Sequence, residues 1–341
     1  MTNRESAPDE TLAQPSGTCE PRVELFEARE VPLGGVRGTM VHRTLPQRQL
    51  PTVGAWCFLD KFGPDAEPMR VLPHPHTGLQ TVTWPLAGEL RHRDSLNNDV
   101  LVRPGQLNLM TAGRGIAHSE FSDPGTPVYG LQLWAALPGP MPTDPAQAAF
   151  QQVTDPPVLQ ADGVELTVFV GSLSLEGSSV TSPAVVHTEL LGADGAVEPG
   201  VDLTIGVAPE HEHAVLVIEG SVAIDGTTID AGPLAYLGAG RSEIHLTASE
   251  QGARFLLLGG RPFDEDLVMF WNFVGRSHEE VQAARADWED QTKAADAALA
   301  AGTQHVDPGP ELRFGLVPGH ESQRIPSPPI PPVRLTPRRR R

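Results

Sequence analysis

Residues 74–83 read HPHTGLQTVT, and the first three of them decide how this chain is best interpreted. The side chains of a β-strand alternate between its two faces, so residues at positions i and i+2 point the same way. His74 and His76 are therefore expected to present two imidazole rings on one face of a strand. Two such rings make half of a metal site, and the other half has to come from a neighbouring strand.

A second segment has the same spacing. His118 and Glu120 are also separated by two positions, and in an antiparallel barrel the two pairs can face each other across the interior. Glycines flank both pairs. Gly78 follows the first pair, and Gly-Arg-Gly at 113–115 precedes the second, where a tight turn would direct the histidine inward. The sequence therefore predicts a metal centre whose ligands are the first histidine pair, His118 and Glu120.

Three neutral imidazole nitrogens and one carboxylate suit Fe(II), Ni(II), Cu(II), Mn(II) or Zn(II), and the donor types alone do not choose among these ions. An isolated His-x-His motif is a weak indication of metal binding. The alternative is a pair of histidines on a core strand that binds no metal. The second pair and the glycines beside both pairs favour the metal centre.

The composition indicates a protein of many short strands. A chain of 341 residues is long enough for two ordinary domains. It contains 34 glycines and 34 prolines, which favour tight turns between strands over long helices.

The charge and the apolar pattern exclude several classes of protein. The formal net charge is −18, whereas direct binding to nucleic acid usually needs a basic patch, and the only dense basic cluster is the frayed end at 338–341. The sequence shows no signal-peptide pattern and no apolar run long enough to span a membrane. Two cysteines make no disulfide framework. We expect a soluble cytoplasmic protein that binds neither membranes nor nucleic acid.

Turn residues and composition divide the chain into two β-rich blocks. A proline-rich stretch separates the blocks, and Ser277 with Glu280 forms a capping box before an alanine-rich segment. A short apolar stretch in the tail, Phe314–Val317, is expected to dock on a barrel. The expected parts are a disordered N-terminal arm at 1–19, an N-terminal metal-binding barrel at 20–137, a linker at 138–145, a C-terminal barrel at 146–307 with a helix at 278–300, and a Pro- and Arg-rich tail at 308–341.

Two segments of this chain resemble the signature segments of the pirin family, in the cupin superfamily: residues 74–83 and MTAGRGIAHSE at 110–120. Arg-Asp-Ser at 93–95 fits the same pattern, and Trp-Asn-Phe-Val at 271–274 is similar to a bacterial subgroup. The resemblance covers residues 20–300. It implies an all-β bicupin fold of two consecutive jelly-roll barrels, with metal in the N-terminal barrel alone. It also implies that the ligands are His74, His76, His118 and Glu120.

Several residues near these motifs need their own interpretation. Gln80 stands where many pirins carry a glutamate, so the resemblance implies a site that is tuned by the loss of one negative charge. His92 is expected to lie beside the ligands. Trp84 or Phe58 could form a wall of the pocket, although aromatic residues are more often part of the core. His-Glu-His at 211–213 repeats the i, i+2 spacing without a partner segment, and we expect a solvated pair that binds no metal.

The resemblance implies two alternative functions. Some pirins resemble quercetinases, which use O2 to open a flavonol ring. In that case the ion is expected to be Fe(II), with Ni, Cu, Mn or Zn as alternatives, and Glu120 would be the catalytic base that takes the proton of the flavonol hydroxyl. Other pirins resemble non-enzymatic, metal- or redox-dependent regulators that bind a protein partner. The acidic charge fits a protein partner better than nucleic acid, and the sequence does not separate the two functions.

Overall fold

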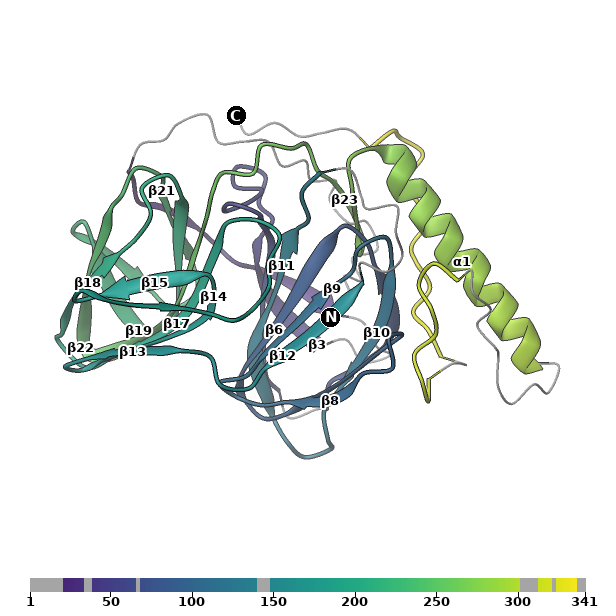
Figure 1. The fold of residues 1–341 in the computed structure, drawn as a ribbon, viewed down its shortest axis with the longest axis horizontal. Helices are drawn as coiled ribbons and strands as arrows, with labels where there is room; N and C mark the ends of the chain where they lie inside the picture. The colour runs from purple at the N-terminus through teal and green to yellow at the C-terminus, as the bar shows by residue number, and fades with distance from the viewer. Residues whose placement is uncertain are drawn as a thin grey trace.

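The computed structural model of the chain describes residues 21–33, 39–65, 68–139, 148–300, 312–320 and 323–335. The expected N-terminal arm and most of the expected linker lie outside these ranges. The described chain forms two β-barrels side by side, with a helix at the outer side of the N-terminal barrel (Figure 1). The predicted all-β class with a C-terminal helix is confirmed. Among the described helical residues, none makes a span long and apolar enough to cross a membrane.

Two facing sheets form the N-terminal barrel. Their strands are β2 (Arg29–Leu33), β3 (Thr39–Leu45), β4 (Trp56–Asp65), β5 (Arg70–His76), β6 (Leu79–Ala87), β7 (Leu90–Asp94), β8 (Asp99–Val102), β9 (Leu107–Thr111), β10 (Ile116–Phe121), β11 (Val128–Ala136) and β12 (Ala149–Val153). The larger sheet has the order β12-β9-β6-β11-β4-β3-β2, and the smaller has the order β5-β10-β7-β8. The predicted histidine pair ends β5, and His118 lies within β10.

The C-terminal barrel is built from a single branched sheet. Its strands are β1 (Glu24–Phe26), β13 (Val158–Ala161), β14 (Val164–Val170), β15 (Ser172–Leu175), β16 (Ser178–Thr181), β17 (Leu190–Val197), β18 (Asp202–Gly206), β19 (Glu212–Ile224), β20 (Thr227–Asp230), β21 (Leu234–Gly238) and β22 (Glu243–Gly260). The main path runs β1-β21-β19-β22-β17-β14-β13. A hairpin of β23 (Val268–Phe270) and β24 (Phe273–Gly275) then leads to the helix α1 (His278–Ala300).

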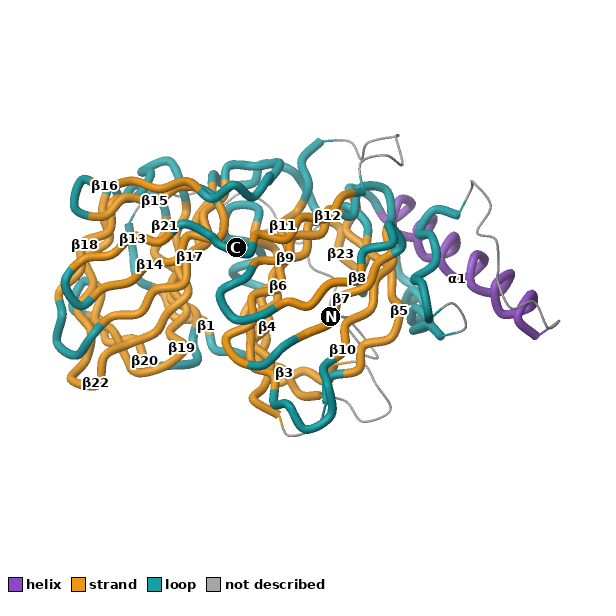
Figure 2. The backbone as a smooth tube through the Cα atoms, turned by 60° about the horizontal axis from the view of Figure 1, so that its bottom comes forward, coloured by secondary structure: helices purple, strands orange, loops and turns teal. Residues whose placement is uncertain are grey.

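Each barrel takes an edge strand from the segment expected to belong to the other. β1 pairs with β21, with Glu24 opposite Tyr236, and β12 pairs with β9, with Phe150 opposite Met110. Figure 2 shows β12 beside β9 on the N-terminal barrel. Sheet membership therefore differs from the expected boundaries at 20–137 and 146–307. The sequence of a short strand does not reveal which open sheet edge it will join, because any edge offers unpaired backbone groups.

Aromatic side chains join the two barrels. The indole N–H of Trp56 donates to the backbone oxygen of Leu191 at 3.0 Å. The indole of Trp84 donates to Asp194 at 2.9 Å and stacks on Phe169, with ring centroids 4.8 Å apart. Trp84 thus faces the second barrel and forms no wall of a pocket in the first.

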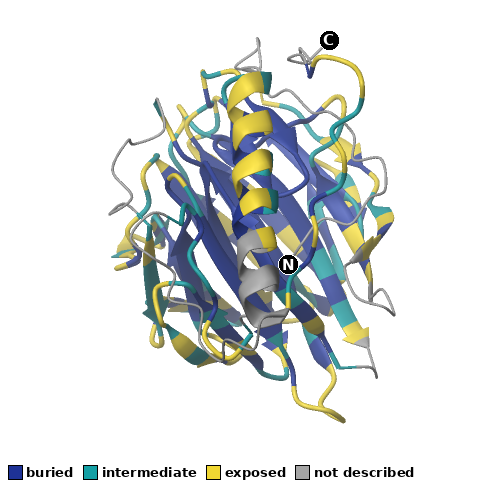
Figure 3. Cartoon of the chain, turned by 90° about the vertical axis from the view of Figure 1, so that its right-hand side faces the viewer, coloured by how far each residue is buried: buried dark blue, intermediate teal, exposed yellow. Residues whose placement is uncertain are grey.

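The helix α1 and the C-terminal tail pack against the N-terminal barrel. Figure 3 shows α1 with its outer side exposed and the buried strands of the barrel behind it. The Ser277 hydroxyl caps the helix by accepting from the backbone N–H of Glu280 at 3.2 Å, as the sequence predicts. The expected division gave this helix to the C-terminal barrel. Its buried side chains, among them Val281 and Trp288, instead join a core cluster with strands β2 to β5 of the first.

The apolar stretch of the tail docks on the barrel, which confirms the prediction. The ring of Phe314 is 1% exposed and contacts those of Phe273 and Trp288, with centroids 6.0 and 5.6 Å away. Its backbone oxygen accepts from the N–H of Ala117 at 3.0 Å. The tail is therefore an integral part of the first barrel.

Replacing Phe314 by Ala should lower the free energy of unfolding by about 3–5 kcal/mol, because it removes a buried ring from a packed cluster. Denaturant unfolding measures this loss, and limited proteolysis should cut the loosened tail sooner. Val333→Ala, in the same tail but 58% exposed, is the matched control and should change stability by no more than about 0.5 kcal/mol. Equal stability of the two variants would contradict the docking of the tail.

Candidate metal centre

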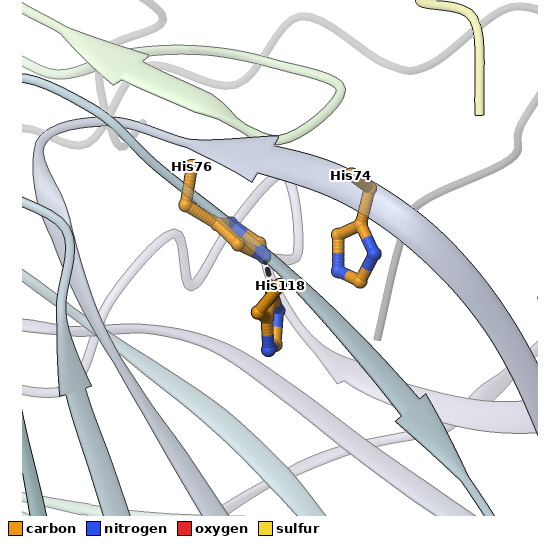
Figure 4. A group of neighbouring side chains, drawn as sticks. All are labelled: His74, His76 and His118. Carbon is orange, nitrogen blue, oxygen red and sulfur yellow. Dashed lines mark hydrogen bonds between the residues drawn. The ribbon is translucent and has the colours of Figure 1, made fainter. Parts of the chain in front are cut away.

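Three histidines converge inside the N-terminal barrel. β5 and β10 pair antiparallel with His118 directly opposite His74, and the alternation of β5 turns His76 to the same side. One ring nitrogen of each histidine lies within 4.8 Å of one nitrogen of each of the others, and all three residues are 0% exposed. Figure 4 shows the rings of His74 and His76 on one strand and that of His118 between them.

The geometry of these nitrogens fits a divalent metal ion. The Nε2 atoms of His76 and His118 are 3.1 Å apart. Metal–imidazole bonds are about 2.0–2.1 Å long, so two ligands at right angles lie about 3 Å from each other. The ring of His74 donates from Nδ1 to the backbone oxygen of Leu72 at 2.9 Å, which leaves Nε2 with its lone pair free to bind. No described residue forms a hydrogen bond to this buried Nε2.

Burial also keeps the three rings in the protonation state that metals bind. It lowers the pKa of His74 to about 3 and holds the pKa values of His76 and His118 well below the usual value. A neutral imidazole is the form that coordinates, because its nitrogen carries a lone pair instead of a proton. Near neutral pH the three rings therefore need to lose no proton when an ion binds.

Glu120 lies next to the three histidines but in a separate group. The pairing register of β10 with β5 shifts between His118 and Glu120, which marks a β-bulge. The carboxylate of Glu120 comes within 4.8 Å of nitrogens of His118 and His92. It accepts a hydrogen bond from the Thr83 hydroxyl at 3.2 Å. The extra residue of the bulge lies in β5, whereas β10 pairs regularly with β7, with His118 opposite Asp94 and Glu120 opposite His92. Glu120 therefore stays on the same face as His118, as the spacing rule predicts, and it adjoins the three histidines through His118.

His92 connects the metal centre to a second buried carboxylate. Its Nδ1 atom lies 3.3 Å from Nδ1 of His118, and its Nε2 atom lies 3.2 Å from Oδ2 of Asp94. Asp94 also accepts from the backbone and side chain of Asn98. The structure thus places His92 beside two of the candidate ligands, His118 and Glu120, as expected. Partners of this kind fix the orientation of a ligating ring.

Three contacts near the site were not predicted from the sequence. The backbone of Asn272 raises the pKa of His76 against the larger opposing effect of burial. Val274 donates its backbone N–H to Thr77 at 3.1 Å, so the segment at 271–274 holds the end of the strand that carries His76. Phe150, on the exchanged strand β12, stacks on the His92 ring with centroids 4.7 Å apart. Only the segment at 271–274 gave a signal in the sequence, as a family resemblance without an assigned role.

Comparisons with known proteins agree with this architecture. The family model described as Pirin matches residues 38–135, and that described as Pirin C-terminal cupin domain matches residues 192–294. The chain belongs to the pirin family. The predicted bicupin fold is therefore confirmed.

Individual relatives span nearly the whole of this pirin. A Pseudomonas aeruginosa protein provisionally named quercetin 2,3-dioxygenase is 41% identical, with 89% of each chain covered. A pirin-like protein of Caulobacter vibrioides is 32% identical, covering 78% of this chain and 92% of its own. The crystal structure of a quercetin 2,3-dioxygenase from Acinetobacter baumannii is 35% identical, with a TM-score of 0.77, and covers 91% of this chain and 96% of that one.

Gln80 does not face the metal centre of this pirin. Its side-chain amide donates to the Thr111 hydroxyl at 2.8 Å and to the backbone oxygen of Val185 at 3.1 Å. Strand alternation places it on the opposite face of β6 from Thr83, which touches Glu120. The structure thus gives Gln80 a place at the contact between the barrels instead of the tuning role that the resemblance implied.

The second histidine pair occupies a different setting. Glu212 accepts hydrogen bonds from the backbone of Gly54 at 2.8 Å and from the Tyr236 hydroxyl at 2.6 Å, and so joins the barrels. His213 is buried, which lowers its pKa to about 4, whereas we expected a solvated pair. His211 has a nitrogen within 4.8 Å of carboxylate oxygens of Glu189 and Glu210, but exposed acidic groups of this kind are common without an ion.

Replacing His74 or His118 by Ala should abolish stoichiometric metal binding, because each substitution removes one of the three converging nitrogens. Metal analysis of the purified variants by mass spectrometry measures the loss, with circular dichroism to check the fold. His187→Ala changes an exposed histidine of the other barrel and should keep the wild-type metal content. Full metal content in the His74 and His118 variants would refute this ligand set.

His213 should make the protein less stable in acid. Its folded-state pKa of about 4 lies below the ordinary histidine value of 6.5, so the unfolded chain takes up a proton at a higher pH than the folded chain. Stability should therefore fall as the pH drops from about 6.5 to about 4, by about 3 kcal/mol in total from this residue. Denaturant unfolding across this range should show a shallower decline for His213→Leu than for the wild type. Parallel curves would contradict this.

Proposed function

We propose that this pirin is a metal-dependent oxygenase of the quercetin 2,3-dioxygenase type. One divalent ion, Fe(II) in the first place and Ni, Cu, Mn or Zn as alternatives, would be held by His74, His76, His118 and Glu120. The observation that carries the proposal is the convergence of three buried, neutral imidazoles beside a buried carboxylate. The likeness to proteins named for quercetin supports a flavonol-like substrate. Two sparse cysteines fit the cytoplasmic location that we also propose.

Each residue of the site has a task in this proposal. A divalent ion, when bound, would act as a Lewis acid and lower the pKa of a hydroxyl group that coordinates it. Glu120 then serves as the base that accepts the hydroxyl proton. The Thr83 hydroxyl holds one carboxylate oxygen of Glu120 at 3.2 Å and so fixes its direction. His92 contacts Nδ1 of His118, and Asp94 in turn contacts His92, so the two residues orient the His118 ring.

The burial of the site serves the same chemistry. The three histidines are 0% exposed and Glu120 is 1% exposed. A site closed to bulk water strengthens the electrostatic interactions within it and protects reactive species from side reactions. These features favour an enzyme over a regulator that offers its metal to a protein partner at the surface.

The test is turnover of quercetin. The protein is loaded anaerobically with Fe(II), Ni(II), Cu(II), Mn(II) or Zn(II), and each form is assayed separately. At least one form should consume quercetin and O2 together, as followed by absorbance and an oxygen electrode. Glu120→Gln should lower kcat by about 10²–10⁴, the usual contribution of a general base, with metal content measured in parallel. Glu250→Gln, an exposed change in the other barrel, should keep full activity. If no metal form turns quercetin over, the oxygenase proposal is wrong. The alternative, a metal-dependent regulator that binds a protein partner, then remains.

A further inference from the structure

A row of buried polar side chains crosses the inner face of the larger N-terminal sheet. Cross-strand pairing places Asn108 opposite Thr83, Thr83 opposite Gln132, Gln132 opposite Asp60, and Asp60 opposite Arg43. None of the five is more than 3% exposed. Polar groups in a barrel core need partners or a function.

Three residues of the row, Arg43 and Asp60 at one end and Thr83 in the middle, form hydrogen bonds with their neighbours. Arg43 donates two hydrogen bonds of 2.7 Å to the two carboxylate oxygens of Asp60, so their charges offset each other. The Thr83 hydroxyl lies 3.2 Å from Oε1 of Glu120 and 3.0 Å from Oε1 of Gln132, which joins the row to the metal centre.

Three side chains around this junction have polar atoms with no hydrogen-bond partner among the described residues. Both carboxamide atoms of Asn108 are in this state, and so are Nε2 of Gln132 and the indole Nε1 of Trp134. Exchanging the positions of oxygen and nitrogen in Asn108 would change nothing, because neither atom has a partner. In Gln132 the exchange would let Nε2 donate to the Thr83 hydroxyl, whose one proton goes to Glu120, and would leave Oε1 without a partner, so one polar atom of this amide stays unpaired either way. The indole N–H of Trp134 can only donate a hydrogen bond, so no alternative placement of its atoms would give it a different partner.

One of these three side chains contacts a proposed metal ligand directly, and the other two adjoin Thr83, which contacts Glu120. The ring of Trp134 stands edge-on to that of His76, with centroids 5.1 Å apart. It also stacks on Phe58, with centroids 3.9 Å apart and an angle of 11° between the planes, and this contact fixes the plane of the indole. Asn108 is the cross-strand neighbour of Thr83. A buried polar atom without a partner is costly to keep, and here such atoms belong to side chains on the inner face of one sheet, next to residues that contact the candidate site.

We propose that Asn108, Gln132 and Trp134 form the recognition site for the substrate, and that they select an uncharged compound with a hydroxyl group next to a carbonyl group. This inference rests on the proposed function, because the metal centre is taken to hold the same ligand. The carboxamide of Asn108 offers one donor and one acceptor, which match a hydroxyl and a carbonyl oxygen. Trp134 adds a donor on a stacked aromatic wall. Glu120 disfavours ligands that carry their own carboxylate.

A purely structural role and a recognition role for Asn108 predict opposite effects of an apolar substitution on stability. If Asn108 were needed for the fold, an apolar residue of similar size would destabilise the barrel. If it is kept for a ligand, Asn108→Leu removes two unpaired buried polar atoms and should leave the free protein equally or more stable. Stability and ligand affinity therefore move in different directions only when the residue serves recognition.

Maltol is a suitable probe, because it is a small hydroxy-pyranone with the hydroxyl and carbonyl groups of a flavonol. Titration calorimetry on Zn(II)-loaded protein measures its binding without redox chemistry. Asn108→Leu should weaken maltol binding by about tenfold or more, with wild-type metal content and an equal or higher Tm. Trp134→Phe keeps the stacked ring, removes the N–H and should weaken binding severalfold. This variant decides the question if Asn108→Leu does not fold.

Gln80→Leu is the matched control, since Gln80 lies on the other face of the same sheet and its amide has partners. It should lower Tm and leave maltol affinity unchanged. Wild-type maltol affinity in the Asn108 and Trp134 variants would overturn the recognition site, as would a fall in Tm for Asn108→Leu as large as that for Gln80→Leu. Failure of the metal-loaded wild type to bind maltol would also overturn it. Because maltol binding needs no O2, a lack of quercetin turnover would disprove the oxygenase without deciding this test.

Discussion

The antiparallel pairing of β5 with β10 is the constraint on which the rest of the structure depends. It sets His118 opposite His74 and places three imidazoles in the buried interior of a barrel. Rings buried in this way have to stay neutral, and the nitrogen of each that does not face the others needs its own support. The surroundings supply this support to two of the rings: the backbone oxygen of Leu72 to His74 and the ring of His92 to His118. Among the described residues, none forms a hydrogen bond to Nδ1 of His76.

The strand pair is held from outside by segments that are distant in sequence. β5 is an edge strand and contains prolines, which lack the N–H that an inner strand would need. The tail covers this edge, because the N–H of Ile325 donates to Pro73 at 2.9 Å. It comes so close to β10 that a Cβ atom added at Gly115 would lie 2.8 Å from the backbone oxygen of Arg313. The candidate metal centre therefore depends on parts of the chain far from the two motifs.

The sequence predicted those features that follow from local rules. The i, i+2 spacing identified the three histidines. The glycines beside them do take positive φ, +71° at Gly78 and +53° at Gly113, and a hydrogen bond of 3.0 Å joins the two turns. The edge that a short strand joins and the face on which Gln80 lies both depend on the partner strand. No property of the residues themselves reports that partner, so these features could not be read from the sequence.

The two faces of the larger sheet differ in how their buried polar groups are paired. On the outer face the buried polar groups are satisfied: the indoles of Trp56 and Trp84 donate to the second barrel, and the amide of Gln80 has two acceptors. On the inner face Trp134 and Asn108 keep polar atoms without a partner among the described residues. The same sheet offers the same chemistry on both sides, so a general failure to pair polar groups does not explain the difference. The unpaired atoms lie on the side that faces the three histidines, where hydrogen-bonding capacity can serve a ligand.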